Sequence, residues 1–232
     1  MRTTSMLILL GMLALAGCND APREEPAVKT EVPQAVDDRD QWQKPDALLA
    51  LMGDLHGKQV ADLFAGDGYF TFQLIKAGAN VIAIVSDPQQ EHSLERKKKD
   101  AGLGDDRLEI RIAPANGSGL KAGEADLGLI VHSFNRIPDR MNYLLDVRNG
   151  LKDPKQLFVV EWQNRPTPVG PPQAERIATE QIMEDLGMAG FSGVGAMADR
   201  MPYQVVLMAM DQMDMSEDEL EHLMEGKEVI GM

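Results

Sequence analysis

Residues 62–71 decide the fold, and they read Asp62-Leu63-Phe64-Ala65-Gly66-Asp67-Gly68-Tyr69-Phe70-Thr71. The apolar run at residues 59–64 predicts a buried strand, and the spacing over residues 69–77 predicts a helix. Glycines between a strand and a helix permit a tight turn and let a ligand approach the backbone closely. The free N–H groups at the start of the helix would favour an anionic part of that ligand. A tight turn that binds nothing has the same local sequence and is the alternative.

On both sides of this turn, short apolar runs alternate with amphipathic stretches. We expect further strands at residues 81–85, 108–112, 127–132 and 156–162, and helices at 45–55, 88–101, 139–150 and 179–189. The last two apolar runs, 194–197 and 203–210, have no helix between them and predict a hairpin at the sheet edge. The pattern predicts an α/β fold: a mostly parallel sheet with helices on both faces and an antiparallel C-terminal edge strand.

The N-terminus has the pattern of an export signal over residues 1–17. Arg2 precedes an apolar stretch at residues 6–15 that is too short to span a bilayer. Residues 15–18, Leu-Ala-Gly-Cys, resemble the lipobox of bacterial lipoproteins. The resemblance implies lipidation of Cys18 and a membrane-anchored protein that faces the periplasm. Asn19 after the cysteine favours the outer membrane, and an ordinary free or buried cysteine is the alternative.

Composition divides the rest of the chain and excludes some functions. Residues 18–41 are rich in proline and acids and predict a flexible tether, residues 42–212 predict one folded domain, and residues 213–232 predict an acidic C-terminal helix or tail. The formal net charge is −14, without a Lys/Arg stripe, so nucleic acid is a poor partner. A single cysteine excludes an internal disulfide.

The glycine turn resembles motif I of class I S-adenosylmethionine-dependent methyltransferases. The likeness continues at residues 40–45, at residues 201–204 and in the loop Thr167-Pro168-Val169-Gly170-Pro171-Pro172. With these segments the chain resembles a bacterial group of methyltransferases inferred from sequence. The resemblance implies the Rossmann-like fold of that class, S-adenosylmethionine as cofactor, and a small-molecule or protein acceptor of unknown identity. The cofactor-binding residues that it implies at the methionine end are Asp62, Gly66, Asp67, Gly68 and Tyr69.

The resemblance is weaker where the ribose and adenine would lie. Val85 stands where these enzymes usually have an acid, which leaves Asp87 as the nearest carboxylate. Asp87 binds the ribose in one interpretation and caps the next helix in the other, which the sequence favours. After the third strand, Pro114 stands where the class often has Asp, and Asn116 is the nearest polar side chain.

His132 is the candidate catalytic residue, because it ends the fourth predicted strand, where ligands bind in open α/β folds. Imidazole titrates near neutrality and can act as a general base. The alternative is a neutral histidine that is hydrogen-bonded to a neighbouring loop. We expect Glu161 and the loop at residues 167–172 to close the same crevice, and Trp162 to be either core or substrate platform.

The sequence leaves two hypotheses for the function, and its C-terminal methionines raise the question of a metal site. Met208, Met210, Met213 and Met215 with His222 offer soft ligands for copper(I), but alternation in a strand favours core packing, so no metal site is expected. The first functional hypothesis is a working methyltransferase. The second is a catalytically inactive methyltransferase-fold lipoprotein that acts as a binding or envelope-assembly module.

Overall fold

The computed structural model describes residues 39–211. Cys18, most of the expected tether and the expected C-terminal helix lie outside these residues. Within residues 39–211, no helix is both long and apolar enough to cross a membrane.

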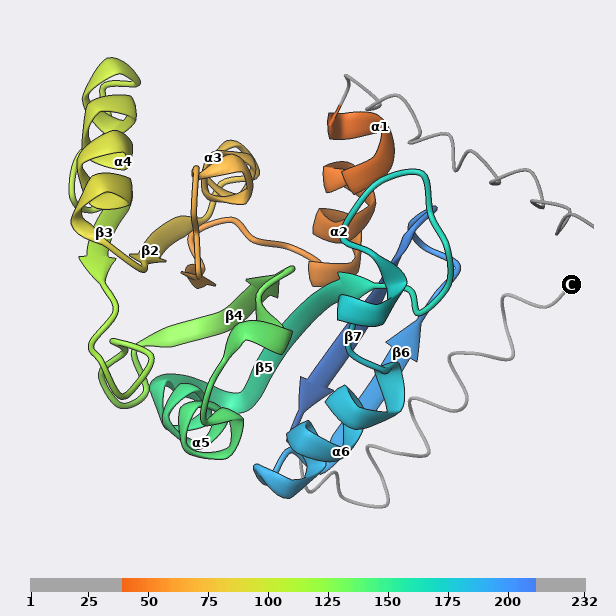
Figure 1. Cartoon of the computed structure of the whole chain (residues 1–232). Coiled ribbons are helices and arrows are strands. Elements are labelled where there is room, and N and C mark those ends of the chain that lie inside the picture. The colour runs from red at the N-terminus through yellow and green to blue at the C-terminus, as the bar shows by residue number, and fades with distance from the viewer. Residues whose placement is uncertain (1–38, 212–232) are drawn as a thin grey trace, which may run out of the picture. The chain divides into compact units, whose positions relative to one another are not determined.

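A seven-stranded sheet forms the centre of the molecule, with the order β3-β2-β1-β4-β5-β7-β6 (Figure 1). The strands β1 to β5 pair in parallel, and β7 is antiparallel to both β5 and β6. The predicted fold class is thus confirmed, and the last two strands form the expected hairpin at the sheet edge. The strand bounds are β1 Gln59–Leu63, β2 Asn80–Val85, β3 Leu108–Ile112, β4 Ala125–Val131, β5 Leu151–Trp162, β6 Gly193–Met197 and β7 Gln204–Met210.

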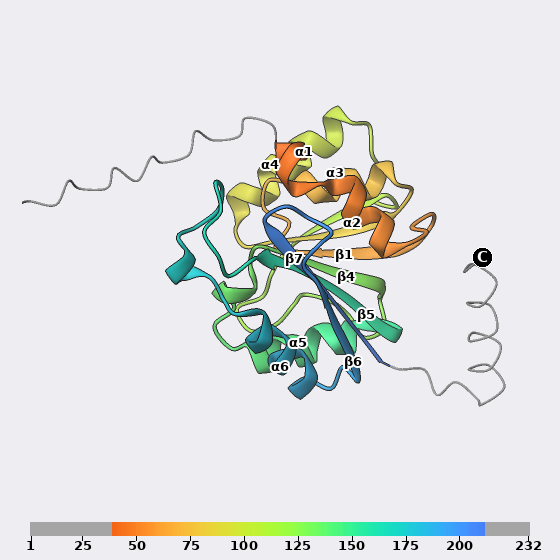
Figure 2. The ribbon, with the colours of Figure 1, turned by 90° about the vertical axis from the view of Figure 1, so that its right-hand side faces the viewer.

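Helices cover both faces of the sheet, as Figure 2 shows. One face packs against a cluster that includes Leu48, Leu74 and Leu94, and the other against a cluster that includes Leu144 and Ile182. Strands β1, β2, β4 and β7 are buried along most of their length, as the continuous apolar runs predict, whereas the edge strands β3 and β6 are only partly buried. The helix bounds are α1 Arg39–Gln43, α2 Pro45–Met52, α3 Tyr69–Lys76, α4 Pro88–Asp100, α5 Arg140–Gly150 and α6 Thr179–Met188, with short 3₁₀ turns at Phe134–Arg136 and Gln173–Glu175.

The structure moves two boundaries relative to the sequence prediction. Helix α1 begins at Arg39, so residues 39–41 are helical, although their composition suggested the end of the tether. Strand β5 begins at Leu151, before residue 156 where the sequence predicted its start, and residues 152–155 form an irregularity within it. The pairing with β4 shifts there, between Ala125↔Leu151 and Leu127↔Gln156.

The register of the parallel strands brings three chain segments to one edge of the sheet. Strand β4 lies between β1 and β5, so their carboxyl ends are neighbours. The glycine turn follows β1, His132 follows β4, and Trp162 ends β5. The fold therefore assembles the candidate site at the edge where open α/β sheets bind their ligands.

Candidate functional site

The glycine turn has two glycines with different surroundings. Gly66 and Gly68 have φ values of 56° and 80°, and the amide of Gly68 donates to the carbonyl of Ala65 at 2.8 Å. A Cβ on Gly66 would meet only the carbonyl oxygen of Phe64, at 3.7 Å. A Cβ on Gly68 would lie 2.4 Å from Cδ2 of Leu94. Gly66 thus leaves space for a ligand, whereas Gly68 lets α3 pack closely on α4.

Asp62 is the next-to-last residue of β1, and its carboxyl group is buried beside the turn. Its side chain accepts a hydrogen bond of 2.6 Å from the hydroxyl of Thr71, which ties β1 to α3. Burial raises the pKa of Asp62 to about 7, although the hydrogen bond from Thr71 acts in the opposite direction. A cationic ligand group beside this carboxylate would favour its ionised form.

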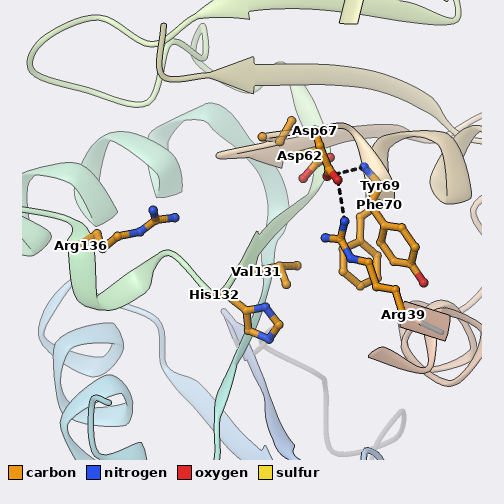
Figure 3. A pocket seen from close by; sticks show the side chains of 10 residues that line it. Arg39, Asp62, Asp67, Tyr69, Phe70, Val131, His132 and Arg136 are labelled. Carbon is orange, nitrogen blue, oxygen red and sulfur yellow. Dashed lines mark hydrogen bonds and ion pairs between the residues drawn. The ribbon is translucent and has the colours of Figure 1, made fainter. Parts of the chain in front are cut away.

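A cavity of about 190 Å³ lies against the turn (Figure 3). Its walls carry charges of both signs: Arg39 is paired with Asp67 beside Asp62, and Arg136 lies apart from this pair. Of the residues that the resemblance assigned to the cofactor, this cavity includes Asp62, Gly66, Asp67 and Tyr69; Gly68, Asp87 and Asn116 do not line it. The full lining consists of Arg39, Asp62, Ala65, Gly66, Asp67, Tyr69, Phe70, Val131, His132 and Arg136.

Helix α1 forms a roof over the turn. Nη1 of Arg39 lies 2.6 Å from Oδ2 of Asp67, and its guanidinium stands 4.0 Å from the centroid of the Tyr69 ring. The hydroxyl of Tyr69 donates to Asp40. The Arg39–Asp67 pair is partly solvated, with side-chain exposures of 39% and 61%, so it contributes little to stability and can open for a ligand. Arg39 was not predicted as a site residue, because the sequence around it has the composition of a flexible tether.

His132 belongs to a cluster of three stacked rings with Trp42 and Trp162, and the two tryptophans also stack on each other with centroids 5.4 Å apart. The His132 ring stacks on Trp162 with centroids 4.3 Å apart and on Trp42 with centroids 6.2 Å apart. Burial, together with the charges of Arg39 and Arg136, lowers the pKa of His132 to about 3. Its Nε2 is buried and has no hydrogen-bond partner among the described residues. The imidazole is therefore neutral at pH 7 and a weak base, and Nε2 is not bonded to a neighbouring loop.

A second cavity of about 350 Å³ adjoins the first and shares His132 and Arg136 with it. Glu161 is buried at its base and accepts from the amides of Phe134 (2.8 Å) and Trp162 (3.3 Å), while burial raises its pKa. Trp162 is both core and wall, since it is only 7% exposed and still lines this space. The lining residues are His132, Asn135, Arg136, Glu161, Trp162, Pro171, Glu175 and Arg176.

The loop at residues 167–172 closes one side of this second cavity through Pro171. Arg176 holds the loop in place, because its guanidinium donates to the Thr167 hydroxyl at 2.6 Å and to the carbonyl of Pro171 at 2.7 Å. The loop also packs on Trp162, since a Cβ on Gly170 would lie 2.7 Å from the indole ring. The expected crevice at the ends of β4 and β5 is therefore present.

Solved structures with this architecture include several methyltransferases. A SAM-dependent methyltransferase from Aquifex aeolicus aligns with a TM-score of 0.68 and 21% identity, over 76% of this chain and 95% of its own. A magnesium protoporphyrin IX methyltransferase from Synechocystis PCC 6803, solved with bound SAH, aligns with a TM-score of 0.56 and 18% identity, over 73% and 83%. The fold is that of class I S-adenosylmethionine-dependent methyltransferases.

The same fold also carries other chemistry. The 4+2 cyclase SpnF aligns with a TM-score of 0.61 and 17% identity, over 77% of this chain and 88% of its own. No protein-family model and no curated protein sequence matches the chain. The comparisons therefore show the methyltransferase fold and do not assign a reaction to it.

The adenosine side of the methyltransferase fold is less complete here than the methionine side. Val85 is fully buried in the core and offers no polar group. Oδ1 of Asp87 accepts from the amides of Gln89 and Gln90, both at 2.9 Å, so the helix-cap interpretation of Asp87 is confirmed. Asn116 is exposed in the loop after β3.

The methionines at the C-terminal end of the methyltransferase fold pack rather than cluster around a site. Met208 and Met210 are half-buried in β7, and Met208 contacts the hydrophobic cluster under α2 and α3. Met213, Met215 and His222 lie outside the described residues. Over residues 39–211, no group of His, Cys, Asp and Glu is arranged to hold a metal ion.

Proposed function

We propose that this chain is an S-adenosylmethionine-dependent methyltransferase that is exported and lipid-anchored. The observation that carries the proposal is the cavity at the glycine turn, which combines a buried acid with arginines in the methyltransferase fold. The methionine end of the cofactor has an ammonium and a carboxylate. Asp62 complements the ammonium, Arg39 complements the carboxylate, and the open side of Gly66 admits the chain between them.

The cofactor, when bound, would supply a methyl group from its cationic sulfur, leaving S-adenosylhomocysteine, to an acceptor atom whose proton would pass to solvent. The chain's own residues would position the acceptor. His132 lies where the two cavities meet, and its neutral Nε2 is free to hydrogen-bond an incoming polar group. Because the pKa of His132 is about 3, it orients the acceptor rather than removing its proton at pH 7. Trp42 and Trp162 stack on each other beside this junction, with ring centroids 5.4 Å apart, and give it an apolar wall.

On the adenosine side, Asp87 would serve two purposes. Both amides of the helix cap converge on Oδ1 of Asp87, which leaves Oδ2 for the ribose hydroxyls. Asn116 would reach the adenine from the exposed loop after β3. This half of the site relies on fewer buried groups than the methionine half, so we expect the methionine half to supply most of the affinity.

Calorimetry of the full mature chain with S-adenosylmethionine and S-adenosylhomocysteine tests the proposal. We expect both to bind, and Asp62→Asn to weaken binding by about tenfold or more, because a charge-assisted hydrogen bond is lost. Arg96→Gln is the control, since Arg96 is exposed on α4 and lines neither cavity. Absence of binding by the wild-type chain at millimolar concentration would contradict the proposal.

Export and anchoring are a separate part of the proposal and rest on residues 15–18. If Cys18 carries the lipid, Cys18→Ala should leave an unprocessed or soluble precursor and abolish labelling by a fatty-acid probe. Sucrose-gradient fractionation then tests the expected position in the cell envelope, in the outer membrane and facing the periplasm. Unchanged labelling and fractionation of Cys18→Ala would overturn this part.

An inactive binding module is the second candidate, and two observations favour it. Val85 offers no ribose ligand, and His132 is too weak a base to take a proton at pH 7. A module of this kind would bind an acceptor-like ligand in the second cavity without turnover. Binding of S-adenosylhomocysteine separates the two candidates, because only the methyltransferase requires it.

A further inference from the structure

The second cavity is lined by two arginines and two glutamates, in a chain with a formal net charge of −14. Arg136 and Arg176 both line it. Among residues 39–211, neither takes part in an ion pair; the arginines that do are Arg39, Arg111, Arg140, Arg148 and Arg200. Two guanidinium groups without a carboxylate partner at one cavity indicate an anionic occupant.

The two arginines differ in what they can still bind. The guanidinium of Arg176 uses its donors within the chain. It donates to the carbonyls of Gln163, Arg165, Val169 and Pro171 and to the hydroxyl of Thr167. The side chain of Arg136 makes one hydrogen bond within the described residues, from Nη2 to the Ser133 hydroxyl at 2.9 Å. Arg136 therefore keeps most of the planar fork that binds a carboxylate or phosphate through two parallel hydrogen bonds.

The acids at the cavity leave this fork free. Both carboxylate oxygens of Glu161 accept from backbone amides, Oε1 from Phe134 and Oε2 from Trp162. Glu175 is exposed at the rim. Arg136 is itself exposed, so a dissolved ligand can reach it without a rearrangement of the core.

The remaining wall indicates the shape of the ligand. His132 and Trp162 present stacked rings, with an angle of 17° between their planes, and Nε2 of His132 is buried without a partner. An aromatic wall favours contact with a planar body. A cavity of about 350 Å³ is of the size that holds a small molecule.

We propose that the second cavity binds a small planar acid, whose carboxylate or phosphate is held by Arg136 beside the rings of His132 and Trp162. That this acid is also the methyl acceptor rests on the proposed function. Arg136 lines both cavities and Arg39 lines only the first, so Arg39→Gln is the variant that affects the cofactor cavity alone.

Tryptophan emission of the full chain reports on this site, because the chain has two tryptophans and both stack on His132. The probes are 4-hydroxybenzoate, phenyl phosphate and the neutral analogue 4-hydroxybenzamide. We expect the two acids to change the emission. The amide should bind at least about tenfold more weakly than the acids. The relative affinity of the two acids shows whether carboxylate or phosphate is the preferred oxyanion.

The variants assign the binding to Arg136. Arg136→Gln should remove the preference for acids over the amide, and Arg136→Lys should restore part of it, because the charge returns without the fork. Arg96→Gln should behave as wild type. Equal affinity for amide and acids, no binding of either acid, or wild-type acid affinity in Arg136→Gln would overturn the proposal.

Titration of the same variants with S-adenosylhomocysteine keeps this inference separate from the proposed function. Arg39→Gln should weaken the binding of S-adenosylhomocysteine and leave the binding of the acids unchanged. If the acids bind as expected and S-adenosylhomocysteine does not bind at all, the acid site stands and the methyltransferase proposal fails. If S-adenosylhomocysteine binds and the acids do not, the acid site fails and the methyltransferase proposal stands.

Discussion

A Cβ on Gly68 would lie 2.4 Å from Cδ2 of Leu94, so helices α3 and α4 meet at this glycine with no room for a side chain. Gly66, two residues earlier, has only the Phe64 carbonyl oxygen within reach of a Cβ, at 3.7 Å. Both glycines have positive φ, and both belong to the motif that resembles a cofactor-binding turn. Gly68 thus allows close packing on one side of the turn, and Gly66 leaves space for a ligand on the other.

Substitution by alanine should separate these two roles. Gly68→Ala should lower the free energy of unfolding by about 2 to 4 kcal/mol, from overpacking against Leu94 and strain at positive φ. Gly66→Ala should cost about 1 kcal/mol, from strain alone, and should weaken S-adenosylhomocysteine by about tenfold. Denaturant unfolding and calorimetry on both variants make the comparison. Equal stability losses in the two variants would contradict the division of roles.

Asp62→Asn should change stability in a pH-dependent way. The pKa of Asp62 is raised from 3.8 to about 7, so the folded chain holds a proton that the unfolded chain releases. Stability from this group is therefore full below pH 3.8 and is lost as the pH rises to about 7. Relative to wild type, Asp62→Asn should gain up to about 4 kcal/mol between pH 4 and pH 8. Parallel unfolding curves for the two chains across this range would refute the raised pKa.

The same variant should bind the cofactor product more weakly, since the ammonium loses its carboxylate. Affinity of the wild-type chain should rise from pH 6 to pH 8 as Asp62 ionises, and this rise should be absent in Asp62→Asn. Calorimetry at several pH values measures both effects. Improved stability together with reduced affinity is the pattern expected of a strained binding site.

Sequence reasoning located the strands, helices and turn well, because their signals are local. The turn glycines, the cap at Asp87 and the apolar runs are each read within a few residues. The roof over the site was missed, because Arg39 and Asp67 are 28 residues apart and Arg39 lies in a stretch with the composition of a tether. Likewise, nothing in the sequence around Leu94 indicates that its side chain packs against Gly68. Contacts between distant segments depend on packing, which no local pattern encodes.

His132→Phe should make the chain more resistant to acid. The pKa of His132 is lowered from 6.5 to about 3, so its contribution to stability is full above pH 6.5 and is lost as the pH falls towards 3. At pH 5 this loss amounts to about 2 kcal/mol in wild type and should be absent in His132→Phe. Phenylalanine keeps the stack with Trp162. Identical losses of stability below pH 6.5 would show that His132 is not the group responsible.

Trp42→Ala tests whether helix α1 is part of the site. Loss of the stacks on His132 and Trp162 should destabilise the chain by about 1 to 3 kcal/mol and shift the emission of Trp162 to longer wavelength as water enters. Affinity for S-adenosylhomocysteine should fall, because the roof over the turn loosens. Leu145→Ala is the control, since Leu145 is 46% exposed on α5. Unchanged affinity in Trp42→Ala would limit α1 to a structural role.

Arg176→Lys should loosen the loop at residues 167–172 while keeping the positive charge. The guanidinium of Arg176 donates to oxygens of Gln163, Arg165, Thr167 and Pro171, and an ammonium has only three donors and no planar fork. With several backbone carbonyls left unpaired, unfolding should become easier by about 2 to 4 kcal/mol. Hydrogen exchange should rise in the loop and at Trp162, on which Gly170 packs. S-adenosylhomocysteine affinity should hardly change, because the loop does not line the first cavity. Exchange that rises equally across the sheet would mean that Arg176 supports the whole fold and not the loop.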